Sequence, residues 1–260
     1  MTSDIGTILS DWPYEPGQVT VRKIIGDDGR DKLQLRLDLG LLQMELTGRP
    51  DGRRPYGFDT VLEYVEGQVS GYSRRHGDAE GFVVTERVAH ELQDEAVMNY
   101  HRYVGLFVLE DFDGVVRDTQ ANLRIFDVLA RFAPTDADRR SLEQFRPYVT
   151  MMNVRAKAQQ AMSGGDYRLA MVFVNSGLAS IRAFFRAHGR AGLFRRANEA
   201  VVLRELRKEV SAHLPKDPLR LLQRRLRRAV AAEHYEDAAR LRDLIAQMQT
   251  SAQSTEAPRE

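Results

Sequence analysis

His90 and Asp94 lie four positions apart in the segment HELQD, a spacing that brings two side chains onto one face of a helix. The segment is the nearest approach in this chain to His-Glu-x-x-His, in which two histidines bind zinc and the glutamate acts as general base. Asp94 stands where that pattern needs its second histidine, although His and Asp at this spacing can still ligate a metal. Because the neighbouring sequence is rich in charge, we interpret HELQD as a turn of a surface helix and predict no metal site.

Other catalytic patterns are absent from the sequence. The chain has no cysteine, which excludes disulfides, thiolate catalysis and cysteine-ligated metals. It has no Gly-x-x-x-x-Gly-Lys-Ser/Thr phosphate loop and no Gly-x-Ser-x-Gly elbow. The remaining candidate histidines, His101, His188, His213 and His234, show no mutual spacing that indicates a site. We therefore predict no catalytic residue and no cofactor, and we expect a protein that is not an enzyme.

Arginines form the strongest local concentration of charge. Arg224, Arg225, Arg227 and Arg228 flank Leu226 in RRLRR, and residues 216–249 hold eight basic and five acidic residues. Such a patch could contact phosphates, an acidic partner or only water. No aromatic platform for stacking bases lies beside it, so nucleic acid is the weaker of these interpretations.

Composition sets the broad class. The 260 residues are 43% hydrophobic and 29% charged with a net charge of +1, which is typical of a globular protein and gives no field that attracts nucleic acid or membrane. The first residues, MTSDIGTILSDWPYEP, carry early acidic residues and no apolar core of a signal peptide. No apolar run approaches the roughly 20 residues needed to span a bilayer. We expect a cytoplasmic protein without a membrane contact.

The predicted fold is mainly α, and the one predicted β region is at the N-terminus. QVTVRKII and KLQLRLDLG alternate in polarity around the turn sequence GDDGRD, with Leu33, Leu35, Leu37 and Leu39 at period two. This pattern predicts a β-hairpin with one buried face, packed on the following helices or on another chain. The Gly/Pro/Arg-rich stretch Thr47–Gly57 is predicted to be a loop, and its exposed arginines make it a second candidate contact.

Helical periodicity extends from about Phe58 to Leu214. Helices are predicted at about 58–75, from an N-cap at Thr85 to Leu109, and at about 114–132, 136–162, 167–188 and 194–214. EDFDGV, GDYRLA and EHYEDA share an aromatic residue and, three positions later, a small apolar one, each where one helix ends and the next begins. We therefore expect antiparallel helical hairpins stacked side by side.

The first two of these junctions resemble tetratricopeptide hairpins. Small and apolar residues stand near that repeat's positions, namely Ala158, Ala161, Ala170, Gly177 and Leu178. The aromatic residues Phe112 and Tyr167 are 55 positions apart, however, where the repeat has about 34. The resemblance implies degenerate, or merely similar, helical hairpins.

The C-terminal segment begins at a break in PKDP. Asp217 is predicted to be an N-cap and Pro218 the first helical residue. Leu219, Leu222, Leu226 and Ala229 follow 3,4,3 spacing, as do Ala238, Leu241, Ile245 and Met248. Two such stripes joined by a tight turn predict a helical hairpin with one apolar seam. We expect Tyr235 to cap the closed end, Ala238 and Ala239 to allow close approach there, and Glu236 to pair with Arg240.

This segment resembles the UvrB/UvrC (UVR) motif, a short helical hairpin found in bacterial repair proteins, Clp-type unfoldases and arginine-kinase activators. The resemblance is carried by Leu222, Leu226, Ala229, Tyr235, Glu236, Ala238, Ala239, Leu241, Arg242, Asp243 and Ile245. It implies an interaction module, without the motor or nuclease of the repair proteins. The residues expected to bind a partner are Leu221, Leu222, Leu226, Val230, Tyr235, Ala238, Ala239, Leu241, Arg242, Asp243, Leu244 and Ile245.

Two functions follow from this resemblance. The first is an adaptor that binds a protein partner, or itself as a homodimer, through the hairpin. The second is a nucleotide excision repair accessory protein that contacts DNA through Arg224, Arg225, Arg227 and Arg228. Leu221, Val230 and Leu244 lie off the predicted seam and need another surface, either on the chain's own helices or on a partner.

The predicted division of the chain has four parts. They are the hairpin and loop (1–57), the helical-hairpin domain (58–214), the UVR motif (216–249) and a polar, disordered tail (250–260).

Overall fold

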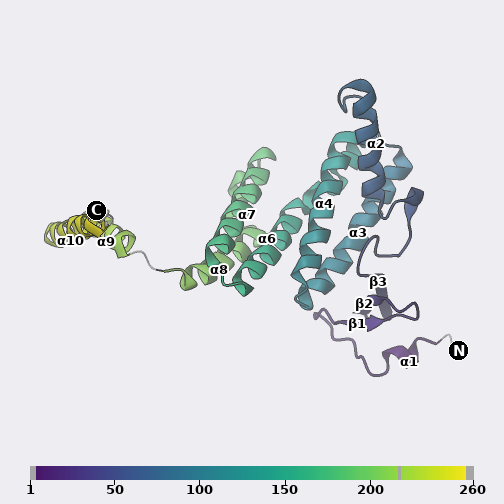
Figure 1. Ribbon diagram of the computed structural model, residues 1–260, viewed down its shortest axis with the longest axis horizontal. Helices are drawn as coiled ribbons and strands as arrows, with labels where there is room; N and C mark the ends of the chain where they lie inside the picture. The colour runs from purple at the N-terminus through teal and green to yellow at the C-terminus, as the bar shows by residue number, and fades with distance from the viewer. Residues whose placement is uncertain (1–3, 216–217, 256–260) are drawn as a thin grey trace, which may run out of the picture. The chain divides into compact units, whose positions relative to one another are not determined.

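The computed structural model describes residues 4–215 and 218–255, and within these the side chains of 218–221 and 248–255 are not described. The chain divides into two compact units, Met1–Ala212, called the body here, and His213–Glu260, the C-terminal unit (Figure 1). A separate N-terminal domain of residues 1–57 is not found, because the strands and the helices of the body belong to one unit.

The N-terminal region contains a three-stranded antiparallel sheet in the order β1 (Val21–Ile25), β2 (Asp31–Leu37) and β3 (Gly40–Glu45). The predicted hairpin is confirmed, with Val21 opposite Leu35 and Ile25 opposite Asp31. Of the predicted buried face, Leu33 and Leu35 are buried, whereas Leu37 and Leu39 are exposed. These two differ from the prediction because β2 ends at Leu37 and a two-residue turn then leads directly into β3. The alternation of residues 41–46 is consistent with this third strand.

A buried ion pair fastens the sheet to the helices. Arg102 donates from Nε and Nη2 to the two carboxylate oxygens of Asp118, at 2.7 and 2.8 Å, and both side chains are almost completely buried. Its third nitrogen, Nη1, donates to the carbonyls of Glu45 at 3.0 Å and Gly48 at 2.8 Å. One guanidinium therefore holds the end of β3 and the start of the 47–57 loop against two helices. Farther along that loop, Arg53 is exposed, as predicted for a candidate contact.

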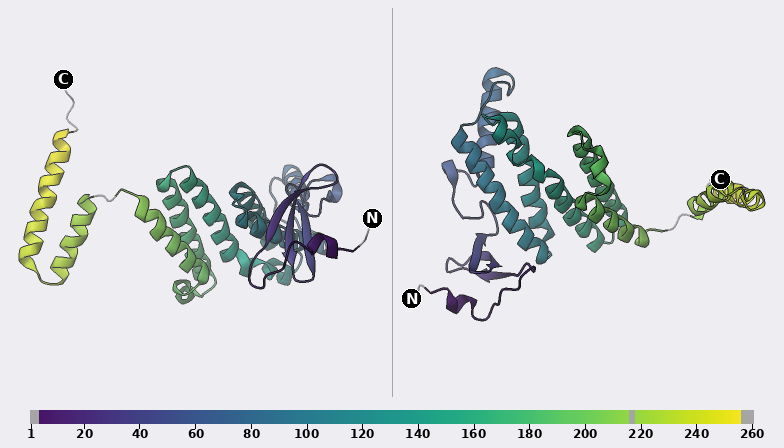
Figure 2. Two further views of the ribbon diagram at one scale, coloured as in Figure 1. Left: turned by 90° about the horizontal axis from the view of Figure 1, so that it is seen from below. Right: turned by 180° about the vertical axis from the view of Figure 1, so that it is seen from behind.

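Most of the body is helical, and neighbouring helices lie antiparallel and side by side (Figures 1 and 2). The pairs α3 with α4 and α6 with α7 form two helical hairpins, and α4 packs on α6. The predicted stacking of hairpins is confirmed, while the likeness to tetratricopeptide repeats stays a prediction. The bounds are α1 Gly6–Leu9, α2 Val61–His76, α3 Glu86–Val108, α4 Phe112–Phe132, α5 Asp136–Ser141, α6 Arg146–Ser163, α7 Tyr167–Ala187 and α8 Asn198–His213.

The helix starts follow local capping chemistry. Thr85 accepts a hydrogen bond from the amide of Val88, which confirms the predicted N-cap of α3. The single helix predicted over 136–162 is wrong, since a short 3₁₀ turn at Glu143–Phe145 separates α5 from α6. Pro147 explains the break, because proline is tolerated in the first turn of a helix but not in its interior. At α2, the buried carboxylate of Glu95 accepts from the amides of Val61 and Leu62.

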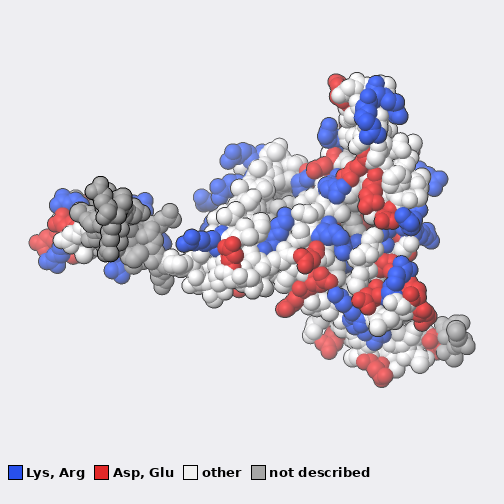
Figure 3. Space-filling view, in the orientation of Figure 1, with Lys and Arg blue, Asp and Glu red and all other residues white. Residues whose placement is uncertain are grey.

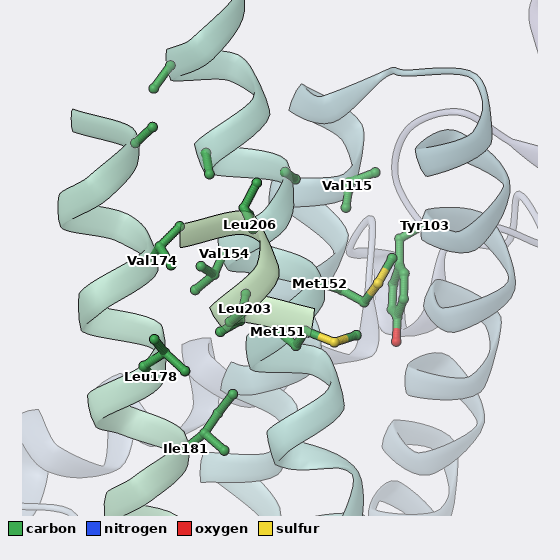
Figure 4. Close-up of a cluster of buried hydrophobic side chains, with 14 of the residues drawn as sticks. Tyr103, Val115, Met151, Met152, Val154, Val174, Leu178, Ile181, Leu203 and Leu206 are labelled. Atoms are coloured by element: carbon green, nitrogen blue, oxygen red, sulfur yellow. The ribbon is translucent and has the colours of Figure 1, made fainter. Parts of the chain in front are cut away.

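The core of the body contains small residues where α6 and α7 meet (Figure 4). The predicted small positions Ala158, Ala161 and Ala170 are buried there, as is Gly177. A Cβ atom at Gly177 would lie 2.5 Å from Cγ2 of Val154, so only glycine allows this approach. The residues drawn in Figure 4 show α6, α7 and α8 contributing to one cluster.

Helix α7 is the one described helix that is long and apolar enough to cross a membrane by length and composition alone. The expectation that no segment reaches this length is therefore wrong by that criterion. In the structure α7 forms a hairpin with α6, and Val174, Leu178 and Ile181 are part of the core.

The three junctions that share a sequence pattern also share one backbone turn. Glu110, Gly165 and Glu233 each adopt a positive φ, of 57°, 76° and 58°. At each, the next amide donates to a carbonyl five residues earlier, the hydrogen bond of a Schellman motif: Asp111 to Leu106, Asp166 to Ala161 and His234 to Ala229. The sequence echo therefore encodes the same helix-to-helix turn three times.

This turn predicts opposite effects of two substitutions in the body. Glu110→Gly is expected to raise the free energy of unfolding by about 0.5–1 kcal/mol, because a positive φ strains every residue except glycine. Gly165→Ala is expected to lower it by a similar amount, since no atom lies near enough to Gly165 for a steric effect. Urea denaturation followed by fluorescence of the single tryptophan, Trp12, measures both. Shifts in the same direction would contradict the assignment.

Candidate functional site: the C-terminal hairpin

The C-terminal unit contains two helices, α9 (Pro218–Ala231) and α10 (Tyr235–Thr255), packed on each other. Ala238 and Ile245 are buried, and four further residues of the predicted seam, Leu222, Leu226, Ala229 and Leu241, are half-buried. The predicted hairpin is thus confirmed. The predicted N-cap at Asp217 and the side chains of Leu219, Leu221 and Met248 lie outside the described residues.

The end of α10 differs from the prediction. A disordered tail was expected from residue 250, but the helix continues to Thr255. Nothing in this stretch interrupts a helix before Pro258, and alanine and glutamine at 252 and 253 favour its continuation. The rest of the predicted tail, 256–260, lies outside the described residues.

The closed end of the hairpin is packed differently from the expectation. Tyr235 is 68% exposed and does not cap the seam. Its counterparts in the body, Phe112 and Tyr167, pack against the hydrophobic core. The turn is the same at all three places, so the difference is that Phe112 and Tyr167 are half-buried against the core, whereas Tyr235 is exposed.

The two adjacent alanines also have different surroundings. Ala238 is buried in the seam, whereas Ala239 is exposed, so the expected close approach at Ala239 is wrong. Successive residues of an α-helix point about 100° apart, and the 3,4 spacing with Leu241 and Ile245 selects Ala238 alone. The expected pair of Glu236 with Arg240 is also not formed; the described ion pair of α10 joins Arg242 to Asp243, at 3.1 Å.

This difference gives a matched pair of variants. Ala238→Leu is expected to lower the free energy of unfolding of the hairpin by about 1–3 kcal/mol, because extra methylenes must enter a packed seam. Ala239→Leu, at the exposed neighbour, is expected to change it by less than about 0.5 kcal/mol. Thermal melting followed by helical circular dichroism compares the two. Equal losses would show that the seam is assigned to the wrong face.

Of the hairpin side chains that the structure describes, three large apolar ones are exposed outside the seam. Val230 is 51% exposed and Leu244 is 47% exposed, and Tyr235 is the third. Tyr235 and Leu244 are nine residues apart, roughly 180° around α10, so they lie on opposite flanks of the hairpin. Uncovered apolar residues therefore occur on both flanks.

The arginines form a groove that the sequence did not predict. Arg224, Arg225, Arg227 and Arg228 are all exposed. A groove of about 510 Å³ is lined by Arg225 and Arg228 of α9, by Arg240 and Asp237 of α10, and by His234 of the turn. Among the described residues, Arg225, Arg228 and Arg240 have no ion-pair partner. The spacing of three between Arg225 and Arg228 could have suggested a basic face on α9, but only the register of the hairpin places Arg240 of α10 at the same groove.

The HELQD segment is a helix turn, as interpreted from the sequence. His90 and Asp94 are exposed on α3, and His90 Nε2 lies 3.8 Å from Asp138 rather than facing Asp94. Within the described part of the chain, no three His, Asp or Glu side chains are grouped to hold a metal.

The fold and this site define a mainly helical protein whose C-terminal unit contains a helical hairpin. The hairpin is a UVR motif: the family model described as "UvrB/uvrC motif" matches residues 216–251. No curated protein and no solved structure matches the chain. A UVR motif indicates a protein-interaction or DNA-repair-related segment, and the match is confined to the C-terminal region.

Proposed function

We propose that this protein is a non-enzymatic cytoplasmic adaptor whose C-terminal hairpin binds a protein partner or a second copy of the chain. The observation that carries the proposal is the exposure of Val230, Tyr235 and Leu244 outside the seam. Each helix of a two-helix hairpin buries one stripe against the other, so apolar residues off that stripe need a further surface. The UVR match supports such a role for this segment.

The body supports a specific mode of docking. Phe112 and Tyr167 follow the same kind of turn as Tyr235, and both are half-buried against the core. A partner helix laid beside α10 would give Tyr235 the apolar contact that its counterparts already have. Two hairpins that pair in this way form a four-helix arrangement. Such docking depends on apolar burial, which added salt does not weaken.

Removing the C-terminal unit tests the proposal. The full chain and a chain ending at Ala212 are compared by light scattering and by capture of partners, with the Trp12 melt as the check on folding of the body. Self-association or capture should be lost without residues 213–260, while the melt of the body is unchanged. If the shorter chain associates and captures as the full chain does, the proposal is refuted.

The second candidate is an accessory protein of nucleotide excision repair that contacts DNA through its Arg-rich helix. The groove lined by Arg225, Arg228 and Arg240 favours it, since these cations have no ion-pair partner among the described residues. Against it, basic and acidic side chains are interspersed over the face of the body in Figure 3, and Asp237 lines the same groove.

Salt dependence distinguishes the two functions. Affinity for a DNA duplex should fall steeply with added salt, because each phosphate contact releases counterions. The variant Arg225→Glu/Arg228→Glu should abolish that binding and leave apolar docking intact. Salt-sensitive duplex binding that this variant removes would establish the repair function in place of the adaptor.

A further inference from the structure

A cavity of about 550 Å³ opens within the body, apart from the residues of the hairpin. Helices α3, α4 and α6 and the turn before α6 provide most of its lining. Its volume is within the range of small-molecule sites, roughly 300–1,000 Å³. Most of the lining is apolar or aromatic, and it includes Val97, Tyr100, Tyr103, Phe126, Phe145 and Tyr148.

Tyr103 provides the cavity with an unused hydrogen-bond donor. Its side chain is 1% exposed, and its hydroxyl has no hydrogen-bond partner among the described residues. The ordinary pKa of tyrosine already keeps the hydroxyl protonated at neutral pH, and burial raises the pKa of Tyr103 further. Figure 4 shows the ring of Tyr103 beside Met151 and Met152. The oxygen is at the end of the ring that is farther from Val115. Among the described residues, Arg49 Nε is the one fully buried side-chain polar atom without a hydrogen-bond partner, so the hydroxyl of Tyr103 reaches open space. Tyr103 lines the cavity, and an acceptor on a ligand there would give the hydroxyl a hydrogen-bond partner.

Asn122, the other deeply buried polar residue of the lining, is already satisfied. It donates to the carbonyl of Ala96 at 2.9 Å and accepts from Asn99 at 3.1 Å. Both the nitrogen and the oxygen of the Asn122 amide are therefore engaged, whereas the hydroxyl of Tyr103 makes no hydrogen bond to the described residues.

The aromatic rings give the cavity a preference for flat molecules. Tyr100 meets Tyr103 edge to face, with ring centroids 5.6 Å apart, and its centroid lies 6.2 Å from that of Tyr148. Tyr100, Phe145 and Val97 are partly open to solvent and form apolar surface at the mouth. Aromatic groups favour edge-to-face and offset contacts at such distances.

The charge of the cavity lining limits the charge that a ligand can carry. Among the described residues that line the cavity, Glu199 is the only charged one. It would repel an anion, and a single half-buried carboxylate is a weak anchor for a cation. The volume also exceeds what one inserted side chain of a protein would fill. A small neutral molecule fits these facts best.

We propose that this cavity binds a small, neutral, flat aromatic ligand that carries a hydrogen-bond acceptor such as a ketone, and that Tyr103 donates to that acceptor. The proposal rests on residues of the body and is independent of the hairpin's function.

The test uses two probes that differ only in the acceptor. Acetonaphthone has a ketone, and ethylnaphthalene has a methylene in its place; both compete with prodan, a neutral fluorescent naphthyl ketone, on the full chain. The wild type is expected to favour acetonaphthone over ethylnaphthalene about five-fold, the worth of one hydrogen bond. In Tyr103→Phe, which keeps the ring, the preference should disappear while ethylnaphthalene binds as before.

A second pair of variants locates the site. Val97→Trp at the mouth should weaken both probes at least about ten-fold by blocking entry. Val172→Trp, an exposed valine of α7 outside the lining, should leave both unchanged. Melting curves confirm that each variant is folded. The proposal is overturned if the wild type binds no probe below about 1 mM, if the ketone preference survives in Tyr103→Phe, or if the two tryptophan variants bind alike.

Discussion

Replacing Asp118 by alanine is expected to lower the free energy of unfolding of the body by about 3–5 kcal/mol. The substitution leaves the guanidinium of Arg102 buried without its counter-charge. It also leaves Arg102 less firmly held. Among the described residues, Arg102 is the only one whose side chain donates to the carbonyls of both Glu45 and Gly48. The loss is measured by urea denaturation with Trp12 fluorescence, which reports on the body because Trp12 is buried there.

Asp127 provides the matched control on the same helix. Its carboxylate pairs with Arg146 at 2.9 Å but is largely exposed, and exposed pairs contribute about 0–1 kcal/mol. Asp127→Ala should therefore have a small effect. The double variant Arg102→Met/Asp118→Leu removes both buried charges and should recover much of the loss, apart from the two carbonyls left without their donor. Equal effects of Asp118→Ala and Asp127→Ala would show that the pair contributes no more than a surface contact.

The sequence could not have revealed this ion pair. Arg102 and Asp118 are 16 positions apart on two helices, and each stands in a segment whose charges resemble those of any solvated helix face. Their meeting depends on the register of α3 against α4, which is set by the turn at Glu110. That turn was visible in the sequence as EDFDGV, but its geometry was not.

The periodicity of the sequence predicted those features that depend on a single helix, such as which residues share one face. The seam of the hairpin was found because Ala238, Leu241 and Ile245 recur at 3,4 spacing. The same spacing excludes Ala239, although the motif has alanine at both positions. The aromatic cavity lay beyond any such pattern, because Tyr103 and Tyr148 come from helices that only the folded body brings together.

The variant Val230→Glu/Leu244→Glu is expected to abolish binding of a partner or of a second copy while leaving the melting temperature unchanged. Both side chains are about half exposed in the chain, so a carboxylate at either position stays hydrated. In a complex that covers them, the same carboxylate would be buried without a partner, which costs several kcal/mol. Light scattering and partner capture, each beside a thermal melt, separate these two effects.

Helix α7 carries a control with the same chemical changes. Leu169 and Val172 are exposed to a similar degree, so Leu169→Glu/Val172→Glu adds the same charge to a different surface and should leave association intact. Single variants then assign the flank: Val230→Glu alone tests the α9 contribution, and Leu244→Glu tests the side of α10 opposite Tyr235. A large fall in melting temperature with unchanged association would mean that these residues stabilise the protein's own fold. In that case the UVR hairpin would be a structural cap rather than a docking module.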